Sequence, residues 1–146
     1  YEILPSDWSS DVCSSDLNYL EAILILSMER PVVRSIDIAD FLDFKKSSVS
    51  VAMKKLRESG DIEVTKEGFI YLTESGERTA SMIYERHVLI SNWLISLGVD
   101  SKTAHDDACR MEHVMSKKSF QAIKAHLKEE HRDVYEESHR EFNKIK

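Results

Sequence analysis

The chain has 146 residues, of which 42% are hydrophobic and 32% are charged, and its formal net charge is −6. A chain of this length can bury a core as one compact unit or as two small subdomains. It contains no apolar run long enough to cross a membrane and no signal peptide pattern, so we expect a cytoplasmic protein. Two cysteines do not make a disulfide framework, so we expect Cys109 to be a free thiol or a metal ligand.

The first seventeen residues differ in character from the rest of the chain. The segment "YEILPSDWSSDVCSSDL" is rich in Ser and Asp, has no hydrophobic period, and contains "DVCSSDL", which resembles translated adapter sequence. We therefore expect residues 1–17 to be non-native or disordered. The remaining chain is predicted to form a DNA-binding domain over 18–75 and a helical domain over 76–146.

Helical patterns begin at Asn18. The stretch "NYLEAILILSM" has a helical apolar stripe that ends before Pro31. "SIDIADFL" follows with Ser35 as the expected N-cap, and a short connection leads to "SSVSVAMKKLRESG". Two short helices joined by a tight turn predict a helix-turn-helix. The inward residues of the shorter helix are expected to be Ile36, Ala39 and Leu42.

The period changes from helical to alternating after Gly60. "DIEVTKEGFIYLT" predicts two short strands around "KEG", the hairpin of a winged helix-turn-helix. Thr73 is expected to cap a long helix over 74–97 that Gly98 closes, and further helices are expected over 101–115 and from Ser116 through Leu127. The charged tail is predicted to be either a partner-dependent helix or a frayed segment. The expected fold is mainly α with a small β-wing: an N-terminal winged helix-turn-helix and then a helical metal-binding and dimerisation domain.

Basic residues gather in the predicted DNA-reading segment despite the acidic total. Residues 30–57 carry seven basic and three acidic side chains, a net +4, which leaves −10 for the rest of the chain. This excess coincides with the predicted recognition helix, although a solvated helix face with ordinary lysines is the simpler alternative. The adjacent wing favours DNA binding. We expect phosphate contacts from Lys45, Lys46, Ser48, Ser50 and Lys54, and base contacts from Ser47 and Val51.

Metal-capable side chains cluster in "HDDACRMEHVM". Spacings of three and four residues place Cys109, Glu112 and His113 on one helical face, with His105 a turn earlier. Taken singly, each group has a structural explanation: a buried thiol, a surface ion pair or a hydrogen-bonded core histidine. Burying all of them without a cation would be costly, and bundle-core metal sites combine ligands from several helices in this way. The further candidates on other helices are His87, Glu21 and Asn18.

In "HDDACRMEHVMS", "YERH", "SSVSVAMKKL" and "GFIYLTESGE", the chain resembles the diphtheria toxin repressor family of metal-dependent transcriptional regulators, which includes the manganese transport regulators. The resemblance runs from about Asn18 to Leu127. It implies a winged helix-turn-helix followed by a metal-binding and dimerisation domain. It also implies a homodimer that binds a pseudo-palindromic operator when divalent metal is present.

The resemblance implies roles for individual residues. Cys109, Glu112 and His113 fall on the family's principal ligands, and His87 and Glu21 match further ones. Cys109 is the iron-type choice, where manganese-type members carry Glu. The remaining positions are Asn18, a weaker ligand where manganese regulators have Asp; His105, where iron-type members have an ancillary-site histidine; and Ser91, where those members have a Glu, which argues against a complete second site.

We therefore expect a metal-dependent DNA-binding transcriptional repressor that senses Fe(II) or Mn(II). As a homodimer it would bind double-stranded palindromic operator DNA and control metal-ion homeostasis genes. We expect no enzyme activity, no small organic substrate and no membrane partner; a zinc hydrolase with Glu112 as base is disfavoured because the chain lacks an HExxH motif. The alternative is a metal-independent winged-helix adaptor for protein interactions. The sequence leaves open which metal acts, whether one or two bind per subunit, and whether the tail histidines take part.

Overall fold

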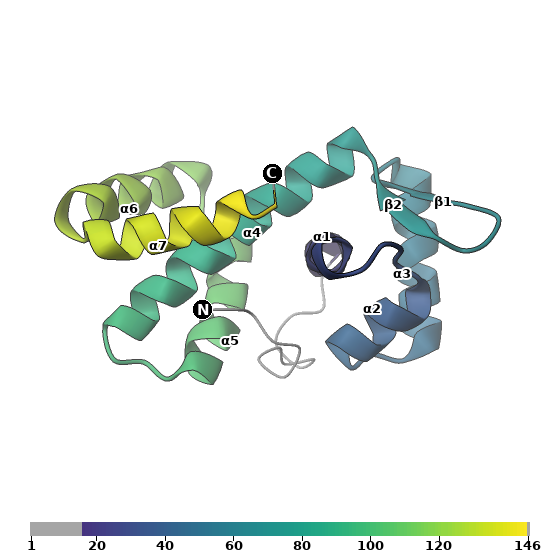
Figure 1. Ribbon diagram of the computed structural model, residues 1–146, viewed down its shortest axis with the longest axis horizontal. Coiled ribbons are helices and arrows are strands. Elements are labelled where there is room, and N and C mark those ends of the chain that lie inside the picture. Colours follow the sequence, from purple (N-terminus) through teal and green to yellow (C-terminus); the bar gives the residue numbers. More distant parts are fainter. Residues whose placement is uncertain (1–15, 146) are drawn as a thin grey trace. The chain divides into compact units, whose positions relative to one another are not determined.

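The computed structural model of the protein describes residues 16–145 (Figure 1). The described part divides into two compact units, 16–82 and 83–145, and the boundary between Met82 and Ile83 falls inside one long helix. No helix among these residues is long and apolar enough to cross a membrane. The elements in chain order are α1 (Asp16–Glu29), α2 (Ser35–Leu42), α3 (Lys46–Ser59), β1 (Ile62–Val64), β2 (Ile70–Leu72), α4 (Glu74–Ser96), α5 (Ser101–Val114), α6 (Lys117–Glu130) and α7 (Arg132–Asn143).

Helix α1 begins two residues before the end of the segment that was predicted to be non-native or disordered. Residues 1–15 of that segment lie outside the described residues, but Asp16 and Leu17 form the start of α1. Every residue of α1 from Asn18 to Leu26 is buried. Within its own unit, α1 packs against both α2 and α3.

Helix α2 confirms the predicted element but corrects its inward face. The N-cap is Arg34 rather than Ser35: the Arg34 N–H donates to Asp37 Oδ2 (2.9 Å), and its carbonyl oxygen accepts from the Asp37 N–H (3.0 Å). Ile36 was expected to face inward but is 40% exposed, whereas Ile38 is fully buried. Two residues span about 200° of helix, so these two side chains necessarily point to opposite faces. Ala39 and Leu42 are buried, as predicted.

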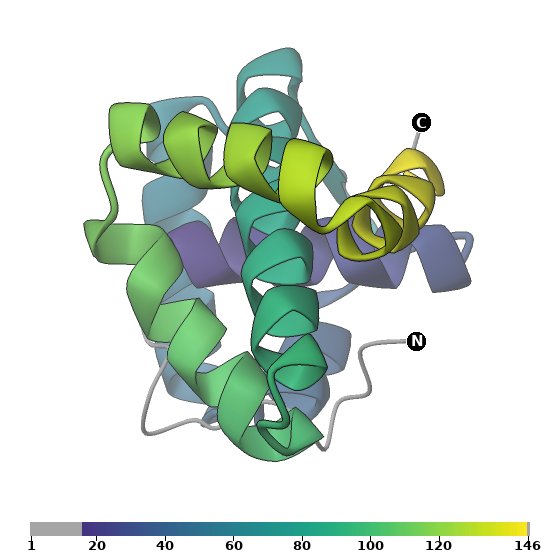
Figure 2. The same ribbon diagram turned by 90° about the vertical axis from the view of Figure 1, so that its left-hand side faces the viewer.

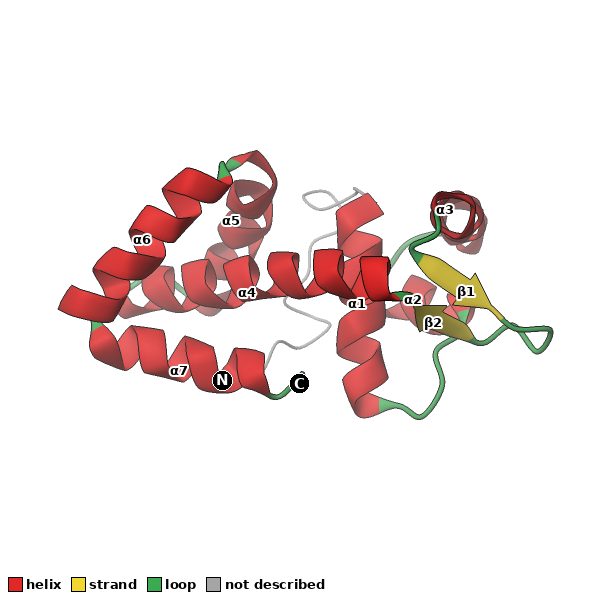
Figure 3. Cartoon of the chain, turned by 90° about the horizontal axis from the view of Figure 1, so that it is seen from above, coloured by secondary structure: helices red, strands yellow, loops and turns green. Residues whose placement is uncertain are grey.

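The predicted wing is present as a two-stranded antiparallel hairpin of β1 and β2, coloured yellow in Figure 3. Ile62 and Ile70 are each 2% exposed, and Ile70 N–H also donates to the carbonyl of Val33 (2.8 Å). Side chains alternate between the two faces of a strand, so one face of this short hairpin is buried. Thr73 caps α4 as expected: its hydroxyl oxygen accepts from Gly76 N–H (3.2 Å).

In the second unit, the predicted end of α4 at Gly98 and the predicted N-cap of α6 at Ser116 are confirmed. Gly98 adopts a left-handed conformation (φ 100°) after α4, and the Ser116 hydroxyl oxygen accepts from Ser119 N–H at the start of α6. Leu89, Phe120 and Leu127 form a buried apolar cluster between α4 and α6.

The charged tail is a helix that packs within the chain. Helices α6 and α7 pack against each other. In Figure 2, α7 (yellow) is seen nearly end-on beside the end of α6. Val134 of α7 is buried, and the rings of Phe142 and Tyr84 stack with centroids 6.5 Å apart. Asn92 Nδ2 of α4 donates to Ser138 Oγ (3.0 Å). Phe142, one of the predicted anchors of the tail, thus finds a partner on α4, and α7 also packs against α6.

Candidate metal centre and DNA-binding face

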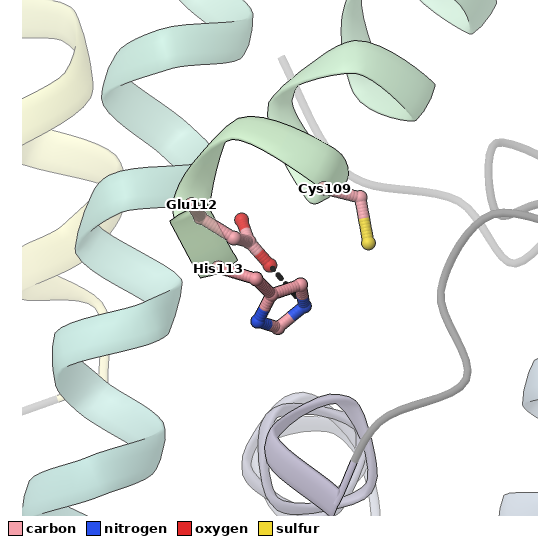
Figure 4. Close-up of side chains that lie close together, drawn as sticks. All are labelled: Cys109, Glu112 and His113. Carbon is pink, nitrogen blue, oxygen red and sulfur yellow. Dashed lines mark ion pairs between the residues drawn. The ribbon is translucent and has the colours of Figure 1, made fainter. Parts of the chain in front are cut away.

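Helix α5 brings three metal-capable side chains together, as its sequence predicts. The helix starts at a strong N-cap, since Asp100 Oδ2 accepts from both the N–H and the hydroxyl of Thr103 (3.0 Å each). Near its C-terminus, one potential ligand atom from each of Cys109, Glu112 and His113 lies within 4.8 Å of the others (Figure 4).

A chain of hydrogen bonds joins α5 to α4 through His87. His87 Nδ1 lies 3.0 Å from Glu112 Oε2, and His87 Nε2 lies 2.9 Å from His105 Nδ1. All three side chains are at most 2% exposed. We call Cys109, His87, His105, Glu112 and His113 the α4–α5 cluster. The structure thus places His105 in direct contact with His87. Ser91 instead binds backbone: its Oγ donates to the carbonyl oxygen of His87 (2.6 Å).

Burial favours the neutral form of His105 and His113. Burial lowers the pKa of His105 to about 4, against a smaller opposing effect of the Asp106 charge. Burial also lowers the pKa of His113, and the charges of His87 and Arg86 act in the same direction. A neutral imidazole has a lone pair available to a metal ion, whereas an imidazolium has none.

The expectation that Cys109 is a free thiol is wrong for this structure. Cys109 is 2% exposed and its sulfur is engaged in a disulfide. The one other cysteine in the sequence, Cys13, lies outside the described residues. A cysteine binds a metal ion as a thiolate, so Cys109 can join a metal site only after its disulfide is reduced.

The donor set of the cluster fits a divalent transition metal. Ligands of one ion at metal–ligand distances of 2.0–2.3 Å lie at most about 4.6 Å apart, so the α5 atoms need only small shifts to share an ion. Imidazole, carboxylate and thiolate together suit metals of the Fe, Co, Ni and Zn type, and carboxylate suits Mn. Burial in a low dielectric adds a reason, because ionised Glu112 gains from a nearby positive charge.

The two candidates on α1 belong to the other unit. Asn18 and Glu21 are both fully buried, and their three-residue spacing puts them on neighbouring faces of α1. Two buried polar side chains in a stretch of α1 that is otherwise hydrophobic indicate a role beyond packing. Their participation in a metal site stays a prediction.

The predicted DNA contacts share one exposed face around α3. Every residue expected to touch DNA is exposed, and the buried side of α3 consists of Val49, Ala52, Met53 and Leu56. Val51 is 70% exposed, a high value for an apolar side chain. Of the nearby basic residues, Arg30 pairs with Asp37 and Lys55 with Asp16. The exposed members are Lys45, Lys46, Ser47, Ser48, Ser50, Val51 and Lys54.

Sequence reasoning missed Arg86, which lies beside His87 in α4. Its side chain is buried, and Nη1 donates to the carbonyl oxygens of Glu112 (3.0 Å) and Met115 (2.7 Å). A charged residue one position from a metal-capable histidine was the available signal, but a helical pattern cannot tell which neighbouring helix such a side chain reaches.

Two family models match the chain. Residues 13–68 match the N-terminal DNA-binding domain of iron dependent repressors, and residues 73–139 match their metal-binding and dimerisation domain. Among curated proteins, an HTH-type transcriptional regulator of Methanocaldococcus jannaschii is 34% identical over 110 residues, 73% of this chain and 87% of that protein. The transcriptional regulator MntR of Escherichia coli O6:H1 is 34% identical over 107 residues, 73% of this chain and 69% of that protein.

Solved structures agree with the fold. The manganese regulator SloR superimposes with a TM-score of 0.72 at 26% identity, over 78% of this chain and 54% of that one. A manganese-dependent transcriptional repressor in complex with manganese gives a TM-score of 0.68 at 28% identity, over 77% of this chain and 52% of that one. The chain thus spans about half the length of these solved relatives. Because both domain models match and together cover most of the sequence, the chain belongs to the iron-dependent repressor family of metal-dependent transcriptional regulators.

Proposed function

We propose that this protein is a metal-responsive repressor that binds a palindromic operator as a homodimer and controls metal-ion homeostasis genes. The observation that carries the proposal is the buried α4–α5 cluster in the region that matches the metal-binding and dimerisation model. Three buried groups hydrogen-bonded in series are costly to desolvate, and a bound cation offsets that cost. The exposed basic face of α3 supplies the DNA-binding surface.

The proposed ligands are His87, Glu112 and His113 with reduced Cys109, and His105, whose Nδ1 lies 2.9 Å from His87 Nε2, is proposed as a residue of an ancillary site. Glu21 is proposed as a further ligand, and Asn18 as a weaker one because an amide oxygen carries no charge. These last two assignments rest on the resemblance of the sequence to the family. A reducing cytoplasm would keep Cys109 available as a thiolate.

The proposed physiological metal is Fe(II) or Mn(II). Two solved relatives are a manganese regulator and a manganese-dependent transcriptional repressor in complex with manganese. The thiol of Cys109 biases the donor set towards Fe(II), because sulfur binds the later first-row metals more tightly than Mn(II). A bound ion supplies positive charge that offsets the carboxylates and links ligands from separate helices.

The proposed consequence for DNA binding is a shift in population. Without a cation, ionised Glu21 and Glu112 would repel each other and leave the orientation of the DNA-binding unit variable. A dimer uses two recognition helices at once only when their separation matches one turn of DNA or a multiple of it. Ligands that hold the units in one orientation therefore raise affinity by selecting the competent population.

The test is an anaerobic metal titration of the reduced, chelator-stripped protein. Duplexes selected from a random-sequence library by the metal-loaded protein serve as the probe, and fluorescence anisotropy reports binding with Fe(II), Mn(II), Co(II) or Zn(II). We expect tight binding with Fe(II) or Mn(II) and weak binding after chelation. Equal binding after chelation would favour the metal-independent adaptor, and tightest activation by Zn(II) would overturn the metal preference.

A matched pair of variants on α5 localises the effect. Glu112→Ala removes a buried carboxylate and is expected to abolish the metal response while the protein remains a folded dimer. Asp107→Ala removes an exposed carboxylate from the same helix and should respond like the wild type. A normal metal response from Glu112→Ala would refute the proposed site.

A further inference from the structure

Arg86 lies where α4, α5 and α6 meet. Its side chain is only 7% exposed, although an arginine must keep its charge when buried. Nη1 donates to the carbonyl oxygens of Glu112 and Met115, and the guanidinium carbon lies 5.3 Å from the centre of the Phe120 ring. One side chain of α4 therefore touches the end of α5, the connection that follows it, and the first turn of α6.

The contacts fall on carbonyl groups that a helix end cannot satisfy by itself. The last four carbonyls of an α-helix lack intrahelical donors, and α5 ends at Val114. The last turn of α5 contains no Lys or Arg, so a cation from α4 supplies the positive charge that favours a helix C-terminus. Only Met115 and Ser116 separate α5 from α6. Arg86 thus contacts residues on both sides of this two-residue connection, the last turn of α5 and the first turn of α6.

Glu112 is consequently held at two points by consecutive residues of α4. Arg86 binds its carbonyl oxygen at 3.0 Å, and His87 Nδ1 lies 3.0 Å from its carboxylate. We infer that Arg86 is a positioning residue of the metal centre: it fixes the C-terminal turn of α5 so that Glu112 and His113 present their ligand atoms together. This inference rests on the proposed metal function.

The direction in which metal affinity changes when Arg86 is substituted distinguishes a positioning role from a purely electrostatic one. A guanidinium near a cation opposes binding through Coulomb repulsion, so removal of the charge alone would tighten metal binding. Loss of a group that orients a ligand instead weakens metal binding, typically by 10–100-fold. The two mechanisms therefore predict opposite changes for the same substitution.

The experiment measures Co(II) binding to the reduced full chain, by affinity and by the visible d–d spectrum. Arg86→Met keeps an unbranched stem and removes the donors, and we expect it to lower Co(II) affinity by about 10–100-fold and to alter the spectrum. Arg86→Lys retains one cationic donor and should recover part of both. Arg110→Met removes an exposed arginine from α5 and should match the wild type.

A destabilised control removes the purely structural explanation. Leu127→Ala opens a cavity in the apolar cluster under α6 without removing a hydrogen bond from Arg86. We expect it to lower thermal stability while the folded protein keeps its Co(II) affinity and spectrum. Equal losses of affinity in Arg86→Met and Leu127→Ala would overturn the inference. If Arg86→Met does not fold, Arg86→Lys decides by the same comparison.

Glu112→Ala in the same assay separates this inference from the proposed function. If Glu112→Ala loses Co(II) binding but Arg86→Met binds as tightly as the wild type with the same spectrum, the positioning role alone is refuted. If Glu112→Ala itself binds Co(II) normally, the proposed metal centre fails, and the role of Arg86 fails with it.

Discussion

Gly76, in the first turn of α4, offers a sharp test of how the wing meets this helix. The residue is buried, and a Cβ atom added to it would lie 2.0 Å from the carbonyl oxygen of Asp61 and 2.9 Å from its carbonyl carbon. Ordinary van der Waals contact is 3.4–4 Å, so backbone must move. Asp61 cannot move freely, since its carbonyl oxygen also accepts from the Thr73 N–H (3.0 Å).

The change in the free energy of unfolding that we expect for Gly76→Ala follows from two opposing effects. Alanine is favoured over glycine inside a helix by about 1 kcal/mol, which alone would stabilise the protein. Overpacking against fixed neighbours costs about 1–3 kcal/mol, and contact with backbone rather than a flexible side chain places Gly76 at the upper end. The expected net loss in the free energy of unfolding is therefore about 2 kcal/mol.

Urea denaturation followed by circular dichroism measures this loss. Glu77→Ala, at the adjacent exposed position, serves as the control and should change stability little. A Gly76→Ala protein at least as stable as the wild type would refute the close approach of α4 to Asp61, the residue that precedes β1. If the variant binds operator DNA more weakly at temperatures below its unfolding transition, the contact between Gly76 and Asp61 also contributes to DNA binding.

Three further substitutions test other parts of the molecule. Lys54→Ala should weaken binding to all DNA sequences and reduce the slope of log K against log[salt] by about one, because the residue is expected to contact phosphate; an unchanged slope would exclude that contact. Ser116→Ala removes the N-cap bond to Ser119 N–H and should cost about 1 kcal/mol of unfolding free energy, whereas Ser116→Asp should retain it. Burial raises the pKa of Glu141, despite a hydrogen bond from Asn92. Folding therefore favours its neutral form, and this contribution is complete below about pH 4 and lost as pH rises through the folded pKa. Glu141→Gln should accordingly be more stable than the wild type at pH 8, with the gain shrinking towards pH 4; a gain independent of pH would contradict this.

The helix ends and the metal-capable face of α5 could be predicted from the sequence because both depend on neighbours along the chain. Thr73 and Ser116 cap helices through backbone groups three residues away, and Gly98 adopts a conformation that its lack of a Cβ permits. Glu112 and His113 follow Cys109 at helical spacing, so one helix suffices to gather them.

Tertiary structure decided what depends on contacts between helices. Ile38 rather than Ile36 faces inward because the packing of α2 selects among faces of similar hydrophobicity. The hydrogen bond between His87 and His105 and the contact of Arg86 with Met115 join residues 18 and 29 positions apart. A local period fixes the direction of a side chain on its own helix, but the partner it meets depends on how separate helices pack. For the same reason the sequence left the charged tail ambiguous: its contacts with α6 and the stacking of Phe142 on Tyr84 of α4 join residues that are distant in the sequence or on separate helices.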